Sequence, residues 1–323
     1  MALLAPSDSI KRDDVIGNPQ QRTGLHALNR ADLFNLLCIP PRIRDTDTLP
    51  STYTPTSASV NQAALEMCVR QRAMLIVAPD PDWASPPARA LTHVIDGRQA
   101  LGFSTQAAQN AALYFPCVRQ VDPLRESQVD TFVPSGAIAG VIARSDVQRG
   151  VWKAPAGLAA TLNGVHELQV NVNDAQNGLL NPPGINCLRS MGANGHVVRG
   201  ARTLAGADGS DDEYKFFSVR RLALFIEECI DRGTQRVVFE PNDGPLRAQV
   251  LLTVGAFMDS LFRQGAFQST TPREACFVKC DRSTMTEHDT THGIVNIVVG
   301  FAPLKPAECV LLTIRQSAGQ PKL

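Results

Sequence analysis

The chain has 323 residues, 44% of them hydrophobic, and 31 Lys and Arg residues balance 31 Asp and Glu residues to a net charge of zero. This length is enough to bury a large core and predicts one to three domains. Zero net charge argues against a broad electrostatic surface for nucleic acid or for an anionic membrane. It also leaves little repulsion between copies, which suits a chain that associates with itself.

Membrane insertion and secretion are not indicated by the sequence. No run of about 18 apolar residues occurs, so no transmembrane helix is predicted. The first residues, MALLAPSDSIKRDD, lack a basic region and a long apolar core, so we expect synthesis in the cytoplasm without a signal peptide. The eight cysteines are scattered, mostly in apolar runs, and predict buried reduced thiols.

The first half of the chain alternates predicted strands and helices. Residues 1–24 are polar and predict a flexible N-terminal segment or arm. From 25 to 130 the order and lengths of the elements are typical of a layered α/β domain. The predicted strands are 33–40, 73–78 and 112–118, the predicted helices are 59–72 and 87–96, and 42–58 is a predicted loop.

Residues 134–157, PSGAIAGVIARSDVQRGVWKAPAG, predict a helix with one surface of small side chains. Pro134 and Ser135 can begin the helix, and residues 146–150 can end it. The small residues would let another backbone approach closely, and the pattern favours structural packing. They are Gly136, Ala137, Ala139, Gly140 and Ala143.

The second half, 131–302, predicts two long helices and several strands, so the whole chain is predicted to be a mixed α/β protein of layered sheets flanked by helices. The helix at 219–232 places Val219, Leu222, Ala223, Ile226 and Ile230 on one face. The helix at 244–264 has so broad an apolar face that burial on more than one side is expected. The predicted strands are 235–240, 275–280, 294–301 and 309–316.

Groups that would indicate catalysis or cofactor binding are not recognised. No phosphate-binding loop, dinucleotide fingerprint or G-x-S-x-G elbow occurs. A zinc site could be formed by Cys276, Cys280, His288 and His292. However, the spacing between the cysteines and the histidines is shorter than in a usual zinc finger, and residues 276 and 280 suit one face of a strand. The acidic loop 208–213 and the carboxylates Glu227, Glu228, Glu240 and Asp243 favour solvated or capping roles. We therefore predict no enzyme, no catalytic residue, no cofactor and no metal.

The C-terminus combines a stiff connector with a short strand. Residues 301–307 carry two prolines, which cannot donate backbone hydrogen bonds. The segment that follows, 310–316, is rich in β-formers and would be about 23 Å long if extended. A strand in this position can complete its own sheet or add to the edge of a neighbour's sheet. The sequence leaves both alternatives open.

Six segments in collinear order resemble those of contractile tail sheath proteins, which occur in phage tails and contractile injection systems. The resemblance is close over 131–316 and loose over 25–130. The segments are 134–157, LNPPGIN (180–186), GARTL (200–204), VRRL (219–222), FEPN (239–242) and PAE followed by VLL (306–312).

The resemblance implies a structural subunit that polymerises helically around an inner tube and contracts to drive the tube through a target envelope. Its partners would be itself, the inner tube protein, and baseplate and terminator or cap proteins, with no nucleic acid and no direct membrane insertion. The particle would be a phage tail or a contractile injection system made in the bacterial cytoplasm.

The resemblance also assigns roles within the second half of the chain. An arm at 303–323 would link subunits by strand addition, and basic residues of a helix would face the tube. The subunit-linking residues would be Val310, Leu311, Leu312, Thr313, Ile314 and Arg315. The tube-facing candidates would be Arg247, Arg263, Arg220 and Arg221.

The chain departs from the family pattern at two places. The Pro-Gly-Val-Tyr-like motif of an N-terminal arm is not found, so another segment does this linking or the chain is a shortened version. Cys309 follows PAE, where an aromatic residue is common, and this should weaken an anchoring contact. The alternative to the sheath is an α/β enzyme or small-molecule-binding protein with a cleft in 25–130.

Overall fold

The computed structural model describes residues 10–41, 43–45, 52–206, 213–235, 243–292, 294–304 and 310–317. The chain divides into two compact units. The first extends to Arg149 and includes Ala154–Phe217, and the second holds Gly150–Lys153 and the chain from Ser218 onward. The domain ranges expected from the sequence, with a boundary near residue 130, stay a prediction.

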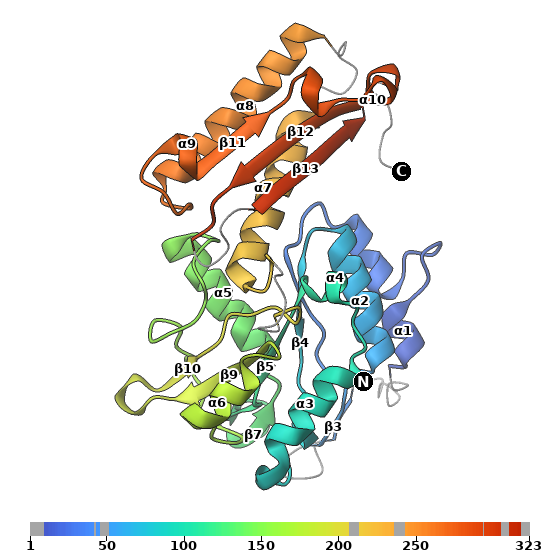
Figure 1. Ribbon diagram of the computed structural model, residues 1–323. Helices are drawn as coiled ribbons and strands as arrows, with labels where there is room; N and C mark the ends of the chain where they lie inside the picture. Colours follow the sequence, from blue (N-terminus) through green and yellow to red (C-terminus); the bar gives the residue numbers. More distant parts are fainter. Residues whose placement is uncertain are drawn as a thin grey trace. The chain divides into compact units, whose positions relative to one another are not determined.

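The first unit is built on a five-stranded sheet of order β1-β4-β5-β9-β10 (Figure 1). The first four strands are parallel, and β10 pairs antiparallel with β9. Every residue of β4 and β5 is buried, as expected for parallel strands covered on both faces. The strands are β1 (Leu36–Cys38), β4 (Met74–Val77), β5 (Ala111–Phe115), β9 (Ile185–Ser190) and β10 (His196–Val198).

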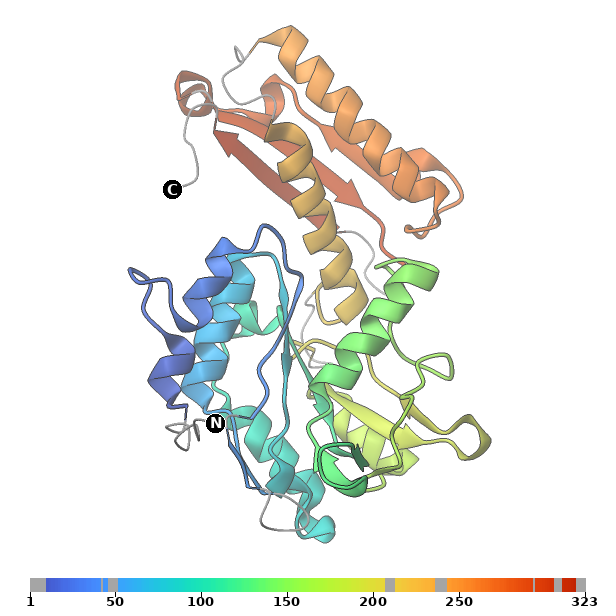
Figure 2. The same cartoon turned by 180° about the vertical axis from the view of Figure 1, so that it is seen from behind.

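Helices cover both faces of this sheet. The sheet lies between α2 (Ala58–Arg70) and α5 (Ser135–Arg149), as Figures 1 and 2 show from opposite sides. The predicted helices at 59–72 and 87–96 and the predicted strand at 73–78 are confirmed. The other helices are α1 (Arg12–Ile16), α3 (Ala90–Ala100), α4 (Thr105–Ala108) and α6 (Asp174–Leu180), with 3-10 helices η1 (Gly24–Arg30), η2 (Pro81–Ala84), η3 (Pro87–Arg89) and η4 (Gly192–Asn194).

Residues 10–30 are part of the first unit. α1 contacts η1 and α2, and Val15 and Ile16 pack against the core that α2 shares with the sheet. This part of the predicted N-terminal segment therefore has regular structure, whereas residues 1–9 lie outside the described residues.

The single strand predicted at 112–118 is wrong. β5 ends at Phe115, and a separate strand begins at Val118. Pro116 has no N–H and cannot continue the ladder of a central strand. The chain therefore changes sheets here, and the second sheet has the order β7-β6-β8, with β6 (Val118–Asp122), β7 (Gln128–Phe132) and β8 (Glu167–Leu168).

The loop predicted at 42–58 also contains regular structure. Two short strands, β2 (Ile43–Asp45) and β3 (Thr52–Thr54), pair antiparallel with Ile43 opposite Thr54. The three-residue strands are too short to give a recognisable alternating pattern.

The two glycines on the small surface of α5 are exposed. The buried face is formed by Ile138, Val141 and Ile142, which face β1 and β4. Apart from the chain neighbours and the backbone of α5 itself, no atom of the described residues lies within 4 Å of a Cβ placed at Gly136 or Gly140. The predicted helix is confirmed, but the expected close approach of a second backbone is not found in these residues.

The second unit is a three-stranded antiparallel sheet of order β11-β12-β13, with two long helices on one face (Figures 1 and 2). These helices and strands confirm the predictions. Residues 236–240 of the strand predicted at 235–240 lie outside the described residues. The elements are α7 (Phe217–Thr234), α8 (Gly244–Arg263), α9 (Pro272–Ala275), β11 (Cys276–Lys279), η6 (Arg282–Thr284), α10 (Glu287–Thr291), β12 (Ile294–Phe301) and β13 (Val310–Ser317).

The two long helices bury different fractions of their apolar surface. All five residues of the predicted face of α7 are buried, between 0% and 2% exposed. On α8, Val250 and Val254 are buried, but Leu251 is 41% and Leu252 is 75% exposed. The expected burial of α8 on more than one side is therefore not achieved within the described part of this chain.

Candidate subunit interface

The C-terminal strand forms one edge of the sheet in the second unit. β13 pairs with β12 over eight residue pairs, from Ile294 opposite Ser317 to Phe301 opposite Val310. The subunit-linking candidates 310–315 all lie in this strand. Val295, Ile297, Val299 and Phe301 of β12 are at most 3% exposed, and the register places them opposite alternate residues of β13. Of the two alternatives from the sequence, the single chain adopts pairing within its own sheet.

The register between β11 and β12 is fixed by an aromatic ring over a glycine. Phe277 stands opposite Gly300, and a Cβ at Gly300 would lie 2.2 Å from the Phe277 ring. Any other residue at this position would displace the ring. This contact fixes the position of β12 relative to β11, and β13 pairs with β12.

An apolar groove of about 300 Å³ lies between α8, α9 and β11. Leu251, Met258, Phe277 and Val278 contribute to its lining, and Asp259 and Arg273 add one charge of each sign. Leu251 and Phe277 are about 40% exposed, so the groove is open to solvent in the single chain.

The four tube-facing candidates differ in exposure. The side chain of Arg263 is 77% exposed and donates to Asp259 at 2.6 Å. Arg247 is half-buried on α8. Arg220 is 14% exposed and lies 4.0 Å from Glu227, and Arg221 is only 4% exposed. Arg263 is therefore exposed, whereas Arg221 is buried.

The connection between β11 and β12 is held by a buried polar cluster. Asn296 of β12 donates to Asp289 at 3.0 Å and to the carbonyl oxygen of Thr284 at 2.9 Å. Asp289 also accepts hydrogen bonds from Thr286 N–H and Oγ1. Sequence reasoning missed this cluster; the signal was the single amide within the apolar run IVNIVVGF.

The residues weighed as a zinc site are not brought together as a set. The rings of His288 and His292 lie 4.0 Å apart on one exposed turn, while Cys280 is buried. Among the described residues, no group of three or more His, Cys, Asp or Glu side chains is placed to hold a metal ion. Burial raises the pKa of the Cys276 and Cys280 thiols.

Two of the recognised segments contact each other in the first unit. Asn186, at the end of LNPPGIN, is fully buried. Its side-chain nitrogen donates to the carbonyl oxygens of Leu113 at 3.1 Å and Arg202 at 2.8 Å. Its side-chain oxygen accepts from the Arg202 N–H at 2.7 Å. Gly200 leaves room for this side chain, because a Cβ there would lie 2.7 Å from the Asn186 amide oxygen. The two segments therefore fix the 200–206 turn to the central strand β5.

Gly184 of the same segment also has a steric role. Its φ is +82°, and a Cβ would lie 2.5 Å from the Thr203 carbonyl oxygen. Only glycine combines this conformation with so close a backbone contact.

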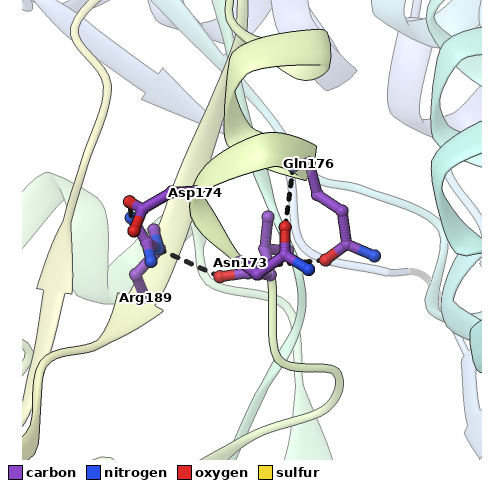
Figure 3. A network of polar contacts seen from close by, with 5 residues as sticks. Asn173, Asp174, Gln176 and Arg189 are labelled. Carbon is purple, nitrogen blue, oxygen red and sulfur yellow. Dashed lines mark hydrogen bonds and ion pairs between the residues drawn. The ribbon is translucent and has the colours of Figure 1, made fainter.

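A polar network anchors the start of α6 beside β9 (Figure 3). Arg189, 9% exposed, donates to the Val172 carbonyl oxygen at 3.0 Å and forms an ion pair with Asp174. Asn173 and Gln176 exchange hydrogen bonds in a capping box. The hydrogen bond from Arg189 lowers the pKa of Asp174. The network positions the segment that leads into LNPPGIN.

The first unit contains a small cavity beside Arg98. It measures about 60 Å³ and is lined by Arg98, Gly102, Phe103 and Leu204, among others. Pockets for small molecules usually measure about 300–1,000 Å³.

In the described ranges no helix has both the length and the apolar character to cross a membrane.

Comparison with known proteins identifies the family. No protein-family model matches the chain. The tail sheath protein of Enterobacteria phage T4 is 28% identical over 170 residues, which cover 50% of this chain and 25% of that protein. The helical sheath of the anti-feeding prophage in its contracted state matches with a TM-score of 0.58 and 31% identity, over 81% of this chain and 76% of that one. The chain belongs to the contractile tail sheath family.

A second solved assembly matches nearly the whole chain. A chain of the anti-feeding prophage baseplate matches with a TM-score of 0.65 and 30% identity, over 90% of this chain and 70% of that one. The mixed α/β fold is therefore that of sheath-family proteins. The chain spans about a quarter of the length of the phage T4 sheath protein that it matches.

Proposed function

We propose that this chain is a structural subunit of a contractile sheath, which polymerises helically around an inner tube and contracts to drive the tube through a target envelope. The observation that carries the proposal is family membership together with a C-terminal strand at a sheet edge. The particle is a phage tail or a contractile injection system, assembled from cytoplasmically made subunits, and the proposed function uses no catalytic residue.

The linking element in this proposal is β13. Its only partner strand in the described chain is β12, and eight residue pairs hold it there. At about 1 kcal/mol net per hydrogen bond, the same ladder formed by β13 of another copy would be as stable as the one within the chain. Exchange of this strand between copies would connect subunits without changing either sheet.

The proposed partners are further copies of the chain, the inner tube protein, and baseplate and terminator or cap proteins. Arg263 and Arg247 of α8 are the preferred tube-facing residues, because Arg221 is buried and Arg220 is largely covered. The alternative, an α/β enzyme or small-molecule-binding protein with a cleft in 25–130, has weaker support because the cavity described beside Arg98 is far smaller than usual ligand pockets.

Truncation tests the linking strand. Removal of 309–323 deletes β13, while removal of 318–323 alone leaves the strand intact and serves as the control. We expect electron microscopy to show continuous sheaths from the control and only short rings or single subunits from the longer deletion. Normal sheaths that contract after deletion of 309–323 would rule out this strand as the link.

Charge reversal tests the tube-facing residues. Arg247→Glu and Arg263→Glu should lower the fraction of extended sheaths that contain a tube, and Arg149→Glu in the first unit is the control. A normal fraction of tube-filled sheaths removes the corresponding arginine from the interface.

A further inference from the structure

Two exposed histidines lie one helical turn apart at α10, the short helix that leads into β12 (Figure 1). His288 is part of α10, and His292 directly follows it. The backbone N–H of His292 donates to the carbonyl oxygen of His288 at 3.0 Å, so both residues belong to the same helical turn. The centroids of their rings lie 4.0 Å apart. A single small ligand can therefore reach both rings from solvent.

The tautomer of His292 follows from a contact with the backbone. Its Nδ1 lies 2.8 Å from the carbonyl oxygen of His288. A carbonyl oxygen can only accept a hydrogen bond, so Nδ1 carries the proton and Nε2 keeps its lone pair. Metal-bound histidines are held in this way, with one ring nitrogen donating to a carbonyl or carboxylate group and the other coordinating the ion. The ring of His292 thus has the tautomer of a metal ligand.

The ring of His288 can supply the second nitrogen. Within the part of the chain that the structure describes, neither nitrogen of this ring takes part in a hydrogen bond. Zinc binds histidine nitrogens at about 2.0–2.1 Å, so two nitrogens on one tetrahedral ion lie about 3.3 Å apart. Rings whose centroids are 4.0 Å apart can meet this spacing through side-chain rotation alone.

We propose that His288 and His292 form a two-histidine site for a divalent transition-metal ion of the class of Zn²⁺, Ni²⁺ or Cu²⁺. Imidazole suits these ions, whereas Mg²⁺ and Ca²⁺ prefer several oxygen ligands. The chain supplies two ligands, and the buried Cys280 is not among them. Water or a donor atom of another molecule fills the remaining positions, so the site is open, unlike a closed structural zinc site.

An ion at this pair would act on the polar cluster beside β12. Asp289, between the two histidines in sequence, is 3% exposed and accepts a hydrogen bond from Asn296 at 3.0 Å. The helix α10 has only five residues, and a helix this short is marginal by itself. An ion that binds the folded turn stabilises it by mass action and, through Asp289, stabilises the connection into β12. This inference does not depend on the proposed function, because a single chain contains both ligands.

Calorimetric titration of the full chain with Ni²⁺ and with Zn²⁺ tests the site, and Mg²⁺ should not bind to it. His288→Gln and His292→Gln should each weaken the binding of Ni²⁺ and Zn²⁺ at least about tenfold, because even the loss of a partner that orients a metal ligand costs about 10–100-fold. His93→Gln, in the first unit, is the control and should leave the affinity unchanged. Equal affinity in the wild-type chain and both variants, or no binding to the wild-type chain, would overturn the proposal.

A rearranged variant separates the geometry of the pair from the number of histidines. Glu287→His combined with His288→Gln keeps that number but places the two histidines five residues apart, about 140° around the helix. We expect this variant to bind Ni²⁺ as weakly as His292→Gln does. Wild-type affinity would show that the two rings need not be neighbours and would contradict the site.

Hydrogen exchange measured by mass spectrometry locates the bound ion. Saturating Ni²⁺ should slow amide exchange over residues 287–292 in the wild-type chain, whereas the same addition to His292→Gln should leave exchange in this segment unchanged. Protection confined to other segments would place the ion elsewhere and rule out the two-histidine site.

Discussion

Asn186 and Arg202 are joined in both directions, because the Asn186 side chain donates to the Arg202 carbonyl oxygen and accepts from the Arg202 N–H. The same side chain also donates to Leu113 of β5, so three backbone groups depend on one buried amide. This relationship ties two recognised segments, LNPPGIN and GARTL, to the central sheet.

Asn186→Ala is expected to destabilise the chain by about 2–4 kcal/mol, because it leaves buried backbone groups without partners. Urea unfolding followed by circular dichroism measures the change. Asn194→Ala, in an exposed turn, is the control and should be within about 0.5 kcal/mol of wild type. Equal stability of the two variants would contradict the structural role of Asn186.

Substitution of Gly184 separates backbone conformation from steric contact. Gly184→Ala adds a Cβ at positive φ and also 2.5 Å from the Thr203 carbonyl oxygen, whereas Gly192→Ala adds one at φ +57° with nothing within 4 Å. We expect a loss of about 1–2 kcal/mol for Gly192→Ala and at least about 3 kcal/mol for Gly184→Ala. Thermal unfolding of both variants measures the difference, and similar losses would show that the contact with Thr203 relaxes freely.

The network around Arg189 predicts an unequal response to removal of its two charges. Arg189 is largely buried and donates to both Val172 and Asp174, while the side chain of Asp174 is 89% exposed. Arg189→Ala should cost about 2–3 kcal/mol, and Asp174→Asn much less, because an exposed ion pair contributes little. Arg189→Lys should not restore stability, since an ammonium group cannot reproduce the fork of a guanidinium. Denaturant midpoints of the three variants test the order.

The ion pair between Arg189 and Asp174 also predicts how the stability of the chain changes with pH. Because Arg189 lowers the pKa of Asp174 in the folded state, its contribution is present above the pKa of the unfolded chain and is lost as the pH falls through the lower, folded value. Asp174→Asn should therefore be closer to wild type in stability at about pH 3 than at about pH 7. A difference that grows on acidification would contradict this assignment.

Buried thiols predict a loss of stability at alkaline pH. Burial raises the pKa of Cys68 and of Cys187 from 9.0 to about 12. The thiols ionise first in the unfolded chain, so their contribution is full below about pH 9 and is lost as the pH rises toward the folded pKa values. In Cys68→Ala the stability should fall less over this range than in wild type. Native alkylation at about pH 8 should be slower at Cys68 than at the half-buried Cys276.

The sequence determined the elements whose signal is local. The apolar face of α7, the helices at 59–72 and 244–264 and the strands at 73–78, 275–280, 294–301 and 309–316 all follow from periodicity, since a buried face repeats with the geometry of its own element. Six segments in collinear order also indicated the family by resemblance. The structure explains residues of two of them, because Gly184, Gly200 and Asn186 meet steric and hydrogen-bonding demands that other residues cannot fulfil.

Only the tertiary structure decided which distant residues meet. It divided 112–118 between two sheets, paired Asn186 with Arg202, buried Arg221 while leaving Arg263 exposed, and set Arg315 opposite Asn296. Periodicity records whether a side chain faces inward, but the partner of a buried polar group depends on the register and packing of segments far away in the chain. For that reason the elements of the linking sheet could be predicted from the sequence, whereas the polar cluster beside its last strand could not.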